Sequence, residues 1–102
     1  MAGMDEPVSL PIDGVLDLHT FRPHDVHVLV PAYLEACRER GILEVRVIHG
    51  KGIGHLRRTV HAILARLPEV VSFVQASELY GGAGATLVVL KPPERAGPTS
   101  RQ

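Results

Sequence analysis

Four short apolar runs of the strand type alternate with two segments of helical periodicity, and this order limits the folds open to the chain. The strand-type runs span residues 14–19, 44–49, 70–76 and 85–91. The helical segments span residues 22–41 and 54–67, with apolar side chains at three- and four-residue spacing. Two successive right-handed crossovers place both helices on the same side of a sheet. We therefore predict an α/β fold: a two-layer βαβαββ sandwich whose mixed four-stranded sheet carries both helices on one face.

The two chain ends lie outside this pattern. Residues 1–12 are expected to form a flexible N-terminal arm, and residues 13–91 the folded domain. Residues 92–102 contain Pro, Gly and Ser without apolar periodicity, so a disordered C-terminal tail is expected. Within the first helical segment, Pro31 is expected to kink the helix near His27.

The first strand-type run contains an acid and a histidine on one side. Because strand side chains alternate, Leu16 and Leu18 are predicted to face the helices. Asp17 and His19 then lie on the opposite face or at its rim. Arg46 of the second run faces the same way if the two strands are neighbours. A structural role remains the alternative, in which the carboxylate binds backbone N–H groups and a carbonyl satisfies the imidazole.

A glycine-rich turn, HGKGIG, follows the second strand-type run and leads into the second helix. Such a turn presents backbone N–H groups at the positive end of a helix dipole, an arrangement suited to a phosphate. Its spacing is neither that of a P-loop nor that of a dinucleotide-binding fingerprint. A tight turn that needs positive φ angles is the alternative interpretation. If the first two strands are parallel and close, Asp17, His19, His49 and Lys51 gather at one sheet edge.

The composition excludes several classes of protein. Residues 45–68 contain five Lys and Arg residues, three His and no acid, although the whole chain has no net charge. A local basic stretch of this kind can bind a polyanion, whereas the absence of Trp argues against a base-stacking platform. One cysteine, Cys37, excludes an internal disulfide and favours a reducing cytoplasm. No apolar run approaches the ~20 residues of a membrane span, so we expect no membrane partner.

Four further side chains are expected to have no chemical role. The histidines among them are predicted to be solvated on the helices, and the cysteine to be buried: His24, His27, His61 and Cys37. A monomer is expected in preference to an obligate oligomer.

Three motifs in order resemble those of the Smr (small MutS-related) domain family, as a stand-alone, bacterial-type member. They are LDLH at residues 16–19, HGKGIGHLRRTV at 49–60 and GGAGATLVVL at 81–90. The resemblance covers about residues 15–91 and implies a βαβαββ sandwich similar to the C-terminal domain of a bacterial translation initiation factor. It also implies nucleic-acid binding and, in several members, nicking of DNA or cleavage of RNA. Many members have glycine where this chain has Thr20.

The family motifs, taken with the basic stretch, assign candidate roles by position. The catalytic candidates are Asp17, His19 and His49. The nucleic-acid-binding candidates are Arg46, Gly50, Lys51, Gly52, Gly54, His55, Arg57 and Arg58. The structural glycine motif comprises Gly81, Gly82, Gly84 and Thr86. Mg²⁺ or another divalent cation is left open as a cofactor, with Asp17 as the candidate ligand.

Three functions follow as hypotheses. In the first, an endonuclease or phosphodiesterase acts on structured DNA or RNA, and His19 or His49 serves as general base or acid. Asp17 orients the imidazole or holds the cation, while Lys51 and Arg57 stabilise phosphoryl charge. The second hypothesis is a non-catalytic module that binds structured nucleic acid. The third is a protein-interaction domain that uses the uncovered sheet face.

Overall fold

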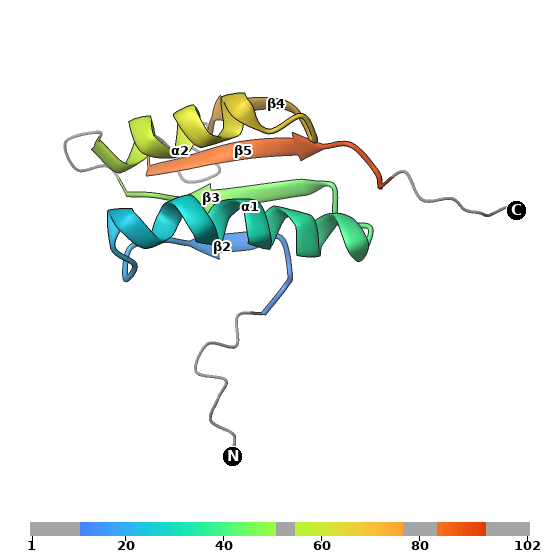
Figure 1. The fold of residues 1–102 in the computed structure, drawn as a ribbon, viewed down its shortest axis with the longest axis horizontal. Helices are drawn as coiled ribbons and strands as arrows, with labels where there is room; N and C mark the ends of the chain where they lie inside the picture. The colour runs from blue at the N-terminus through green and yellow to red at the C-terminus, as the bar shows by residue number, and fades with distance from the viewer. Residues whose placement is uncertain (1–10, 51–54, 77–83, 94–102) are drawn as a thin grey trace, which may run out of the picture.

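The computed structural model describes residues 11–50, 55–76 and 84–93 (Figure 1). Its elements follow the predicted order. They are β2 (Val15–Asp17), α1 (Pro23–Glu39), β3 (Glu44–Ile48), α2 (His55–Arg66), β4 (Val70–Gln75) and β5 (Ala85–Leu90). Among the described residues, no helix has the length and apolarity that a membrane crossing requires.

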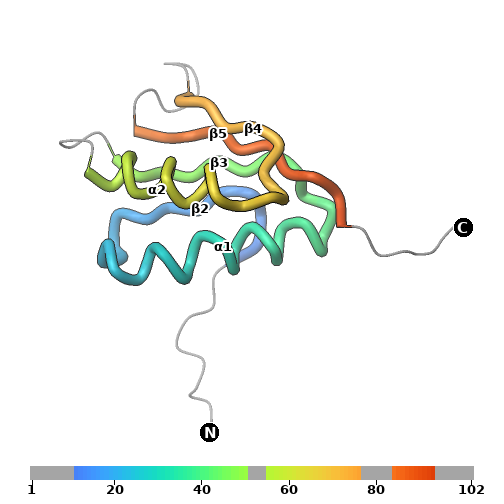
Figure 2. The backbone as a smooth tube through the Cα atoms, turned by 45° about the horizontal axis from the view of Figure 1, so that its top comes forward, coloured from blue at the N-terminus to red at the C-terminus, as the bar shows by residue number. Residues whose placement is uncertain are grey.

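The four strands form one mixed sheet in the order β2-β3-β5-β4. β2 and β3 are parallel, and β5 is antiparallel to both β3 and β4. Both helices lie on the same face of the sheet, side by side (Figure 2). The predicted two-layer α/β sandwich is therefore confirmed, with the last strand of the chain inserted between β3 and β4.

The core lies between the sheet and the two helices. Leu16 and Leu18 point into it from the β2 segment, as the alternation predicts, and Val45 and Val47 do so from β3. The helices supply mainly aliphatic side chains at three- and four-residue spacing: Val26, Val30, Leu34 and Cys37 from α1, and Val60, Ile63 and Leu64 from α2. The prediction that Cys37 is buried is confirmed.

Helix α1 begins and ends where local chemistry requires. Pro23 occupies the first turn, where a missing N–H has no consequence, and Arg22 before it is extended. The helix continues through Pro31, which has no N–H to donate to the carbonyl of His27. The expected kink near His27 stays a prediction. Gly41 follows the helix with φ +77°, a conformation that favours glycine.

Tyr33 of α1 fixes the chain that enters β2. Its buried hydroxyl accepts the N–H of Gly14 at 3.2 Å and faces the carbonyl of Val15 at 3.1 Å. Gly14 has φ +93°, and a Cβ there would lie 3.3 Å from the carbonyl oxygen of Glu44. The start of β2 is thus held against both α1 and β3.

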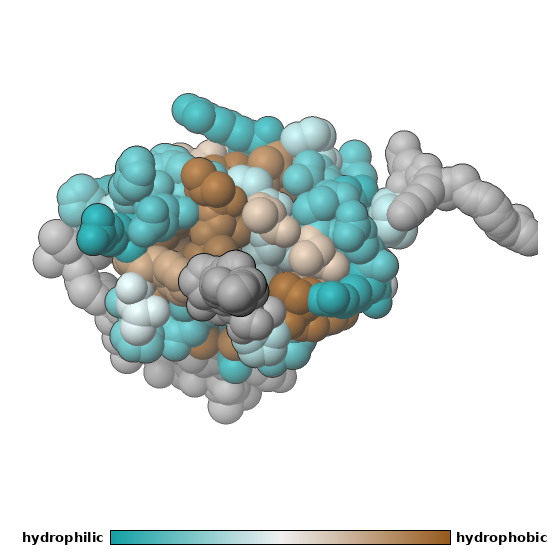
Figure 3. All heavy atoms as spheres, turned by 60° about the horizontal axis from the view of Figure 1, so that its bottom comes forward, coloured by the Kyte–Doolittle hydropathy of each residue, from teal (hydrophilic) through white to brown (hydrophobic). Residues whose placement is uncertain are grey.

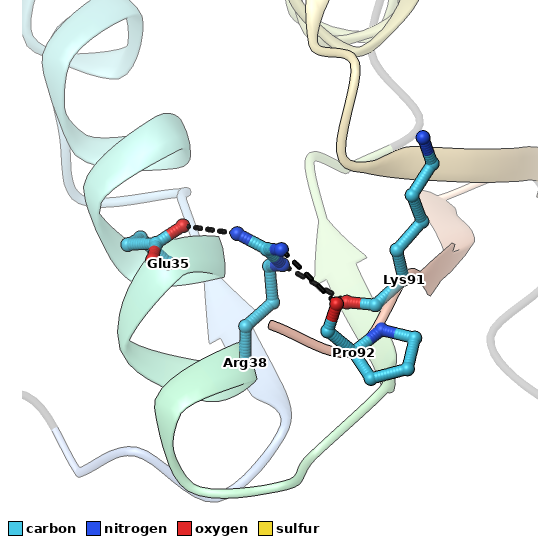
Figure 4. Close-up of polar contacts among 4 residues, drawn as sticks. All are labelled: Glu35, Arg38, Lys91 and Pro92. Atoms are coloured by element: carbon cyan, nitrogen blue, oxygen red, sulfur yellow. Dashed lines mark hydrogen bonds and ion pairs between the residues drawn. The ribbon is translucent and has the colours of Figure 1, made fainter. Parts of the chain in front are cut away.

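In the last turn of α1, Arg38 fastens the chain that leaves β5 (Figure 4). Its Nη1 lies 2.7 Å from the Glu35 carboxylate, and its Nε donates to the carbonyl of Lys91 at 2.9 Å. A longer contact of 3.3 Å joins Nη2 to the carbonyl of Pro92. The helix layer and the central strand are therefore cross-linked by one guanidinium.

Candidate active site at the carboxyl ends of β2 and β3

Asp17 and His19 form a hydrogen-bonded pair at the end of β2. Asp17 Oδ1 accepts the backbone N–H of His19 at 3.0 Å and lies 2.8 Å from His19 Nδ1. Because a carboxylate only accepts, Nδ1 carries the proton, and in the neutral imidazole Nε2 is the bare nitrogen. The His19 side chain is 69% exposed, so this ring is open to solvent.

The electrostatics of the pair favour an ionised acid. The backbone N–H of His19 is the largest cause that lowers the pKa of Asp17, followed by the hydrogen bond from the His19 side chain. Asp17 is therefore a carboxylate at neutral pH. An oriented imidazole backed by a carboxylate is the arrangement that general bases use.

The pair lies beside the end of β3, as the parallel geometry requires. Asp17 is opposite Ile48 in the ladder, and the N–H of Leu18 donates to the Ile48 carbonyl at 2.8 Å. The glycine turn follows immediately. Lys51, Gly52 and Gly54 lie outside the described residues, so their closeness to the pair stays a prediction.

His49 lies on the other side of the sheet from Asp17 and His19. It shares the face of Val45 and Val47, and it is 5% exposed. Its Nδ1 lies 3.0 Å from the Gly50 carbonyl oxygen and its Nε2 2.9 Å from Thr86 Oγ1. The structure thus brings His49 to the same sheet edge but directs both its ring nitrogens into the protein.

His61 is not the solvated side chain that its place on a helix suggested, and that prediction is wrong. Its Nε2 lies 2.8 Å from Thr86 Oγ1, and its ring centroid is 5.0 Å from that of Phe73. The centroids of His61 and His49 are 6.2 Å apart in an edge-to-face arrangement. The position borders the apolar stripe of α2, which was the one sequence signal for partial burial. His24 and His27 are exposed, as predicted.

Burial lowers the pKa of both inner histidines. For His49 the positive charge of Arg57 adds to this effect, while the Gly50 carbonyl opposes it. For His61 the other imidazole and Arg57 both add to the effect of burial. Both rings are therefore neutral at neutral pH.

Gly84 and Thr86 join the end of β3 to β5. The N–H groups of His49 and Gly50 both donate to the Gly84 carbonyl at 2.9 Å. Gly50 has φ +85°, in the region that favours glycine. Thr86 is completely buried, with its hydroxyl between the two imidazoles. Gly81 and Gly82 lie outside the described residues.

Cationic side chains lie on both sides of this edge. Arg57 is half-buried in the first turn of α2, and His55 and Arg58 are exposed beside it. On the open sheet face, Arg46 stands between Val15 and Leu87 in the ladder. Among the described residues nothing forms a hydrogen bond with its buried Nε.

The open sheet face around Arg46 is largely apolar. A hollow of about 430 Å³ is lined mainly by apolar side chains, and Glu44, Arg46 and Ser72 are the polar residues in its lining. Seen from the side of β2, patches of apolar surface alternate with polar ones (Figure 3). Asp17 faces the same way as Arg46, as the alternation predicts.

The described residues contain no group of three or more His, Cys, Asp or Glu side chains able to hold a metal ion. One carboxylate, Asp17, lies at the site, and its Oδ1 already binds His19. Paired acids, which a two-metal site requires, are not found in this part of the chain. Among the described residues at this edge, the Asp17–His19 pair has the geometry for proton transfer.

The sandwich and its two edge motifs define a class of protein, and the sequence places the chain in it. Residues 16–91 match the family model of the Smr domain, so the chain belongs to the Smr domain family. The Smr domain of Thermus thermophilus MutS2 superposes with a TM-score of 0.74 at 35% identity, covering 78% of this chain and all of that one. Escherichia coli YdaL, a stand-alone small MutS-related protein, gives a TM-score of 0.71 at 26% identity, covering 79% and 66%.

Two groups of longer proteins contain a segment whose sequence is similar to most of this chain. The endonuclease MutS2 of Solidesulfovibrio magneticus is 43% identical over 77 residues, which are 76% of this chain and 10% of that protein. The ribosome rescue factor SmrB of Tolumonas auensis is 37% identical over 79 residues, 78% of this chain and 45% of that protein. The chain thus spans less than half the length of either relative.

Proposed function

We propose that this Smr domain binds structured DNA or RNA and cleaves a phosphodiester bond, with His19 as the proton-transferring group. The observation that carries the proposal is the Asp17–His19 pair, an exposed imidazole whose Nε2 is left bare, at the end of the strand that neighbours β3. Relatives named as an endonuclease and as a ribosome rescue factor support a function directed at nucleic acid. A monomer in the cytoplasm is part of the same proposal.

In the proposed reaction, His19 Nε2 takes the proton of an attacking hydroxyl. The hydroxyl oxygen bonds to phosphorus, the bond from phosphorus to the leaving oxygen breaks, and the leaving oxygen takes a proton from solvent. Asp17 stabilises the imidazolium that forms, because its Oδ1 already accepts the Nδ1 proton. The attacking hydroxyl belongs to water or, in RNA, to the neighbouring 2′-OH.

Backbone N–H groups of the glycine turn, with Lys51 and Arg57, are proposed to bind the phosphoryl oxygens. Arg46, His55 and Arg58 are proposed to contact flanking phosphates. Arg46 lies on the face of Asp17, which supports a contact between its positive charge and a phosphate on that face. Since both ring nitrogens of His49 bind within the protein, we assign it the positioning of the turn rather than proton transfer.

The test uses labelled branched DNA, duplex DNA and folded RNA, each with and without Mg²⁺. Asp17→Asn combined with His19→Ala is expected to lower the cleavage rate by about 10²–10⁴-fold, the range of general acid–base catalysis, with little change in affinity. His27→Ala, which removes an exposed histidine of α1, is the matched control and keeps full activity. Replacing the target ribose with deoxyribose tells a 2′-OH attack from hydrolysis.

Other results separate the alternatives. Salt-dependent binding without cleavage of any substrate by the unaltered protein establishes the non-catalytic module instead. If no nucleic acid binds even at low salt, the protein-interaction domain is the better account. Arg46→Leu is expected to weaken binding and reduce the salt dependence by about one counterion, whereas Arg66→Leu, at the far end of α2, is the charge-matched control.

A further inference from the structure

We infer that His61 is a positioning residue of the candidate site. Through the hydroxyl of Thr86 it fixes the tautomer of His49, and through His49 it holds Gly50, the first glycine of the turn. Three contacts form a continuous chain from α2 to the turn: His61 Nε2 to Thr86 Oγ1 at 2.8 Å, Thr86 Oγ1 to His49 Nε2 at 2.9 Å, and His49 Nδ1 to the Gly50 carbonyl at 3.0 Å.

The direction of each hydrogen bond follows from the last one. The Gly50 carbonyl only accepts, so His49 Nδ1 carries a proton. In the neutral ring His49 Nε2 is then bare and accepts the Thr86 O–H. Thr86 has a single proton, so its oxygen accepts from His61 Nε2–H, and His61 Nδ1 is the bare nitrogen. Every donor between His61 and Gly50 points the same way.

Both polar groups of Gly50 have partners, and the hydrogen bonds that start at His61 supply one of them. The N–H of Gly50 donates to the Gly84 carbonyl on the β5 side, and its C=O accepts from His49. Gly50 has φ +85°, and no atom of the described residues lies within 4 Å of the place a Cβ would take there. The imidazole of His49 therefore supplies the restraint on the carbonyl.

Without the N–H donor at position 61, His49 could also adopt its other tautomer, in which Nε2 carries the proton. The Thr86 oxygen could then accept from His49 Nε2–H, which leaves a bare Nδ1 against the Gly50 carbonyl. Two acceptors facing each other repel, so the restraint on the Gly50 carbonyl is lost. Loss of this bond frees that carbonyl without removing any group that is proposed to contact substrate.

The charged surroundings favour the neutral form of both imidazoles in this series of hydrogen bonds. Arg57 faces the pair from α2, and each imidazole faces the other from α2 and β3. Phe73 of β4 and Thr86 of β5 are uncharged. Among the described residues no carboxylate forms an ion pair with either ring. A second proton on either imidazole would have no acceptor within this series of hydrogen bonds, and no carboxylate of the described residues would balance its charge.

The functional consequence rests on the proposed function, in which the turn binds phosphate. His61→Phe keeps an aromatic ring against Phe73 but donates no hydrogen bond. We expect it to weaken nucleic-acid binding, and to raise KM, by about three- to tenfold with kcat nearly unchanged. His61→Gln retains an N–H donor and is expected to restore most of the affinity. His27→Phe, on the exposed surface of α1, is the matched control and leaves both quantities unchanged.

Nitrogen-15 NMR of the histidine rings tests the inference apart from any activity. In the unaltered protein, His49 is expected as the Nδ1–H tautomer and His61 as the Nε2–H tautomer. In His61→Phe, the His49 signals should move toward a mixture of tautomers, and its titration should move to higher pH. An unchanged His49 tautomer in this variant overturns the inference even if nucleic acid is bound. Failure of the unaltered protein to bind nucleic acid overturns the proposed function while the NMR result still decides the role of His61.

Discussion

Replacing Thr86 with valine removes one buried hydroxyl and almost no volume. Thr86 is completely buried, and its oxygen lies 2.9 Å from His49 Nε2 and 2.8 Å from His61 Nε2. The valine leaves both nitrogens without their partner. His49 is nearly inaccessible to water, whereas His61 is half-buried and can recover part of its hydration.

The expected loss of stability follows from how deeply His49 and His61 are buried. An unsatisfied buried polar group costs about 1–3 kcal/mol, so the fully buried nitrogen of His49 contributes most of the loss. With a smaller share from His61, Thr86→Val is expected to lower the free energy of unfolding by about 2–4 kcal/mol. That is a large fraction of the ~5–15 kcal/mol that stabilises an ordinary domain.

Urea unfolding of Thr86→Val and of Thr86→Ser measures this cost directly. The serine keeps the hydroxyl and loses one buried methyl group, which costs about 1 kcal/mol. An unchanged denaturant slope shows that both variants unfold as the unaltered protein does. If the valine variant is no less stable than the serine variant, the hydroxyl does not connect the two imidazoles and the reasoning is refuted.

Two further predictions concern stability. Tyr33→Phe is expected to lower the free energy of unfolding by about 1–3 kcal/mol, because the N–H of Gly14 and the carbonyl of Val15 lose a buried partner; urea unfolding equal to that of the unaltered protein contradicts this. Stability is also expected to fall as pH drops below about 6.5, the ordinary histidine pKa, because the unfolded chain then binds protons that His49 and His61 resist in the folded state. The lowered pKa of Asp17 acts in the same direction only near pH 4 and below. Unfolding measured at pH 7.5, 6 and 5 therefore isolates the contribution of the histidines. Equal stability at all three pH values contradicts the prediction that their burial makes stability depend on pH.

The Asp17–His19 half of the site could be predicted from local pattern. Alternation along one strand places Leu16 and Leu18 in the core and the polar pair on the other face, and the structure agrees. The tight turn with positive φ angles, which was the alternative interpretation of the glycine-rich stretch, agrees with Gly50, whose φ is +85°. These features depend on residues within a few positions of each other, so the sequence carries them directly.

The inner half of the site could not be predicted in this way. His49 and Thr86 are 37 positions apart, and His61 and Thr86 are 25 apart. Their contact requires β5 to lie beside β3 and α2 to pack over the same strand end. Periodicity gave His61 a place at the border of an apolar stripe, but only packing decided that its ring meets a buried hydroxyl.

The sequence alone therefore determined the order of the elements, the core-facing side of each and the outward direction of the acid–histidine pair, because short-range alternation and helical spacing encode them. The tertiary structure decided that the last strand occupies the centre of the sheet, which joins two histidines through one threonine behind the glycine turn. That arrangement results from burying apolar surface between segments that are distant in the sequence. Which arrangement is most stable depends on all of these contacts together, so a local sequence pattern does not reveal it.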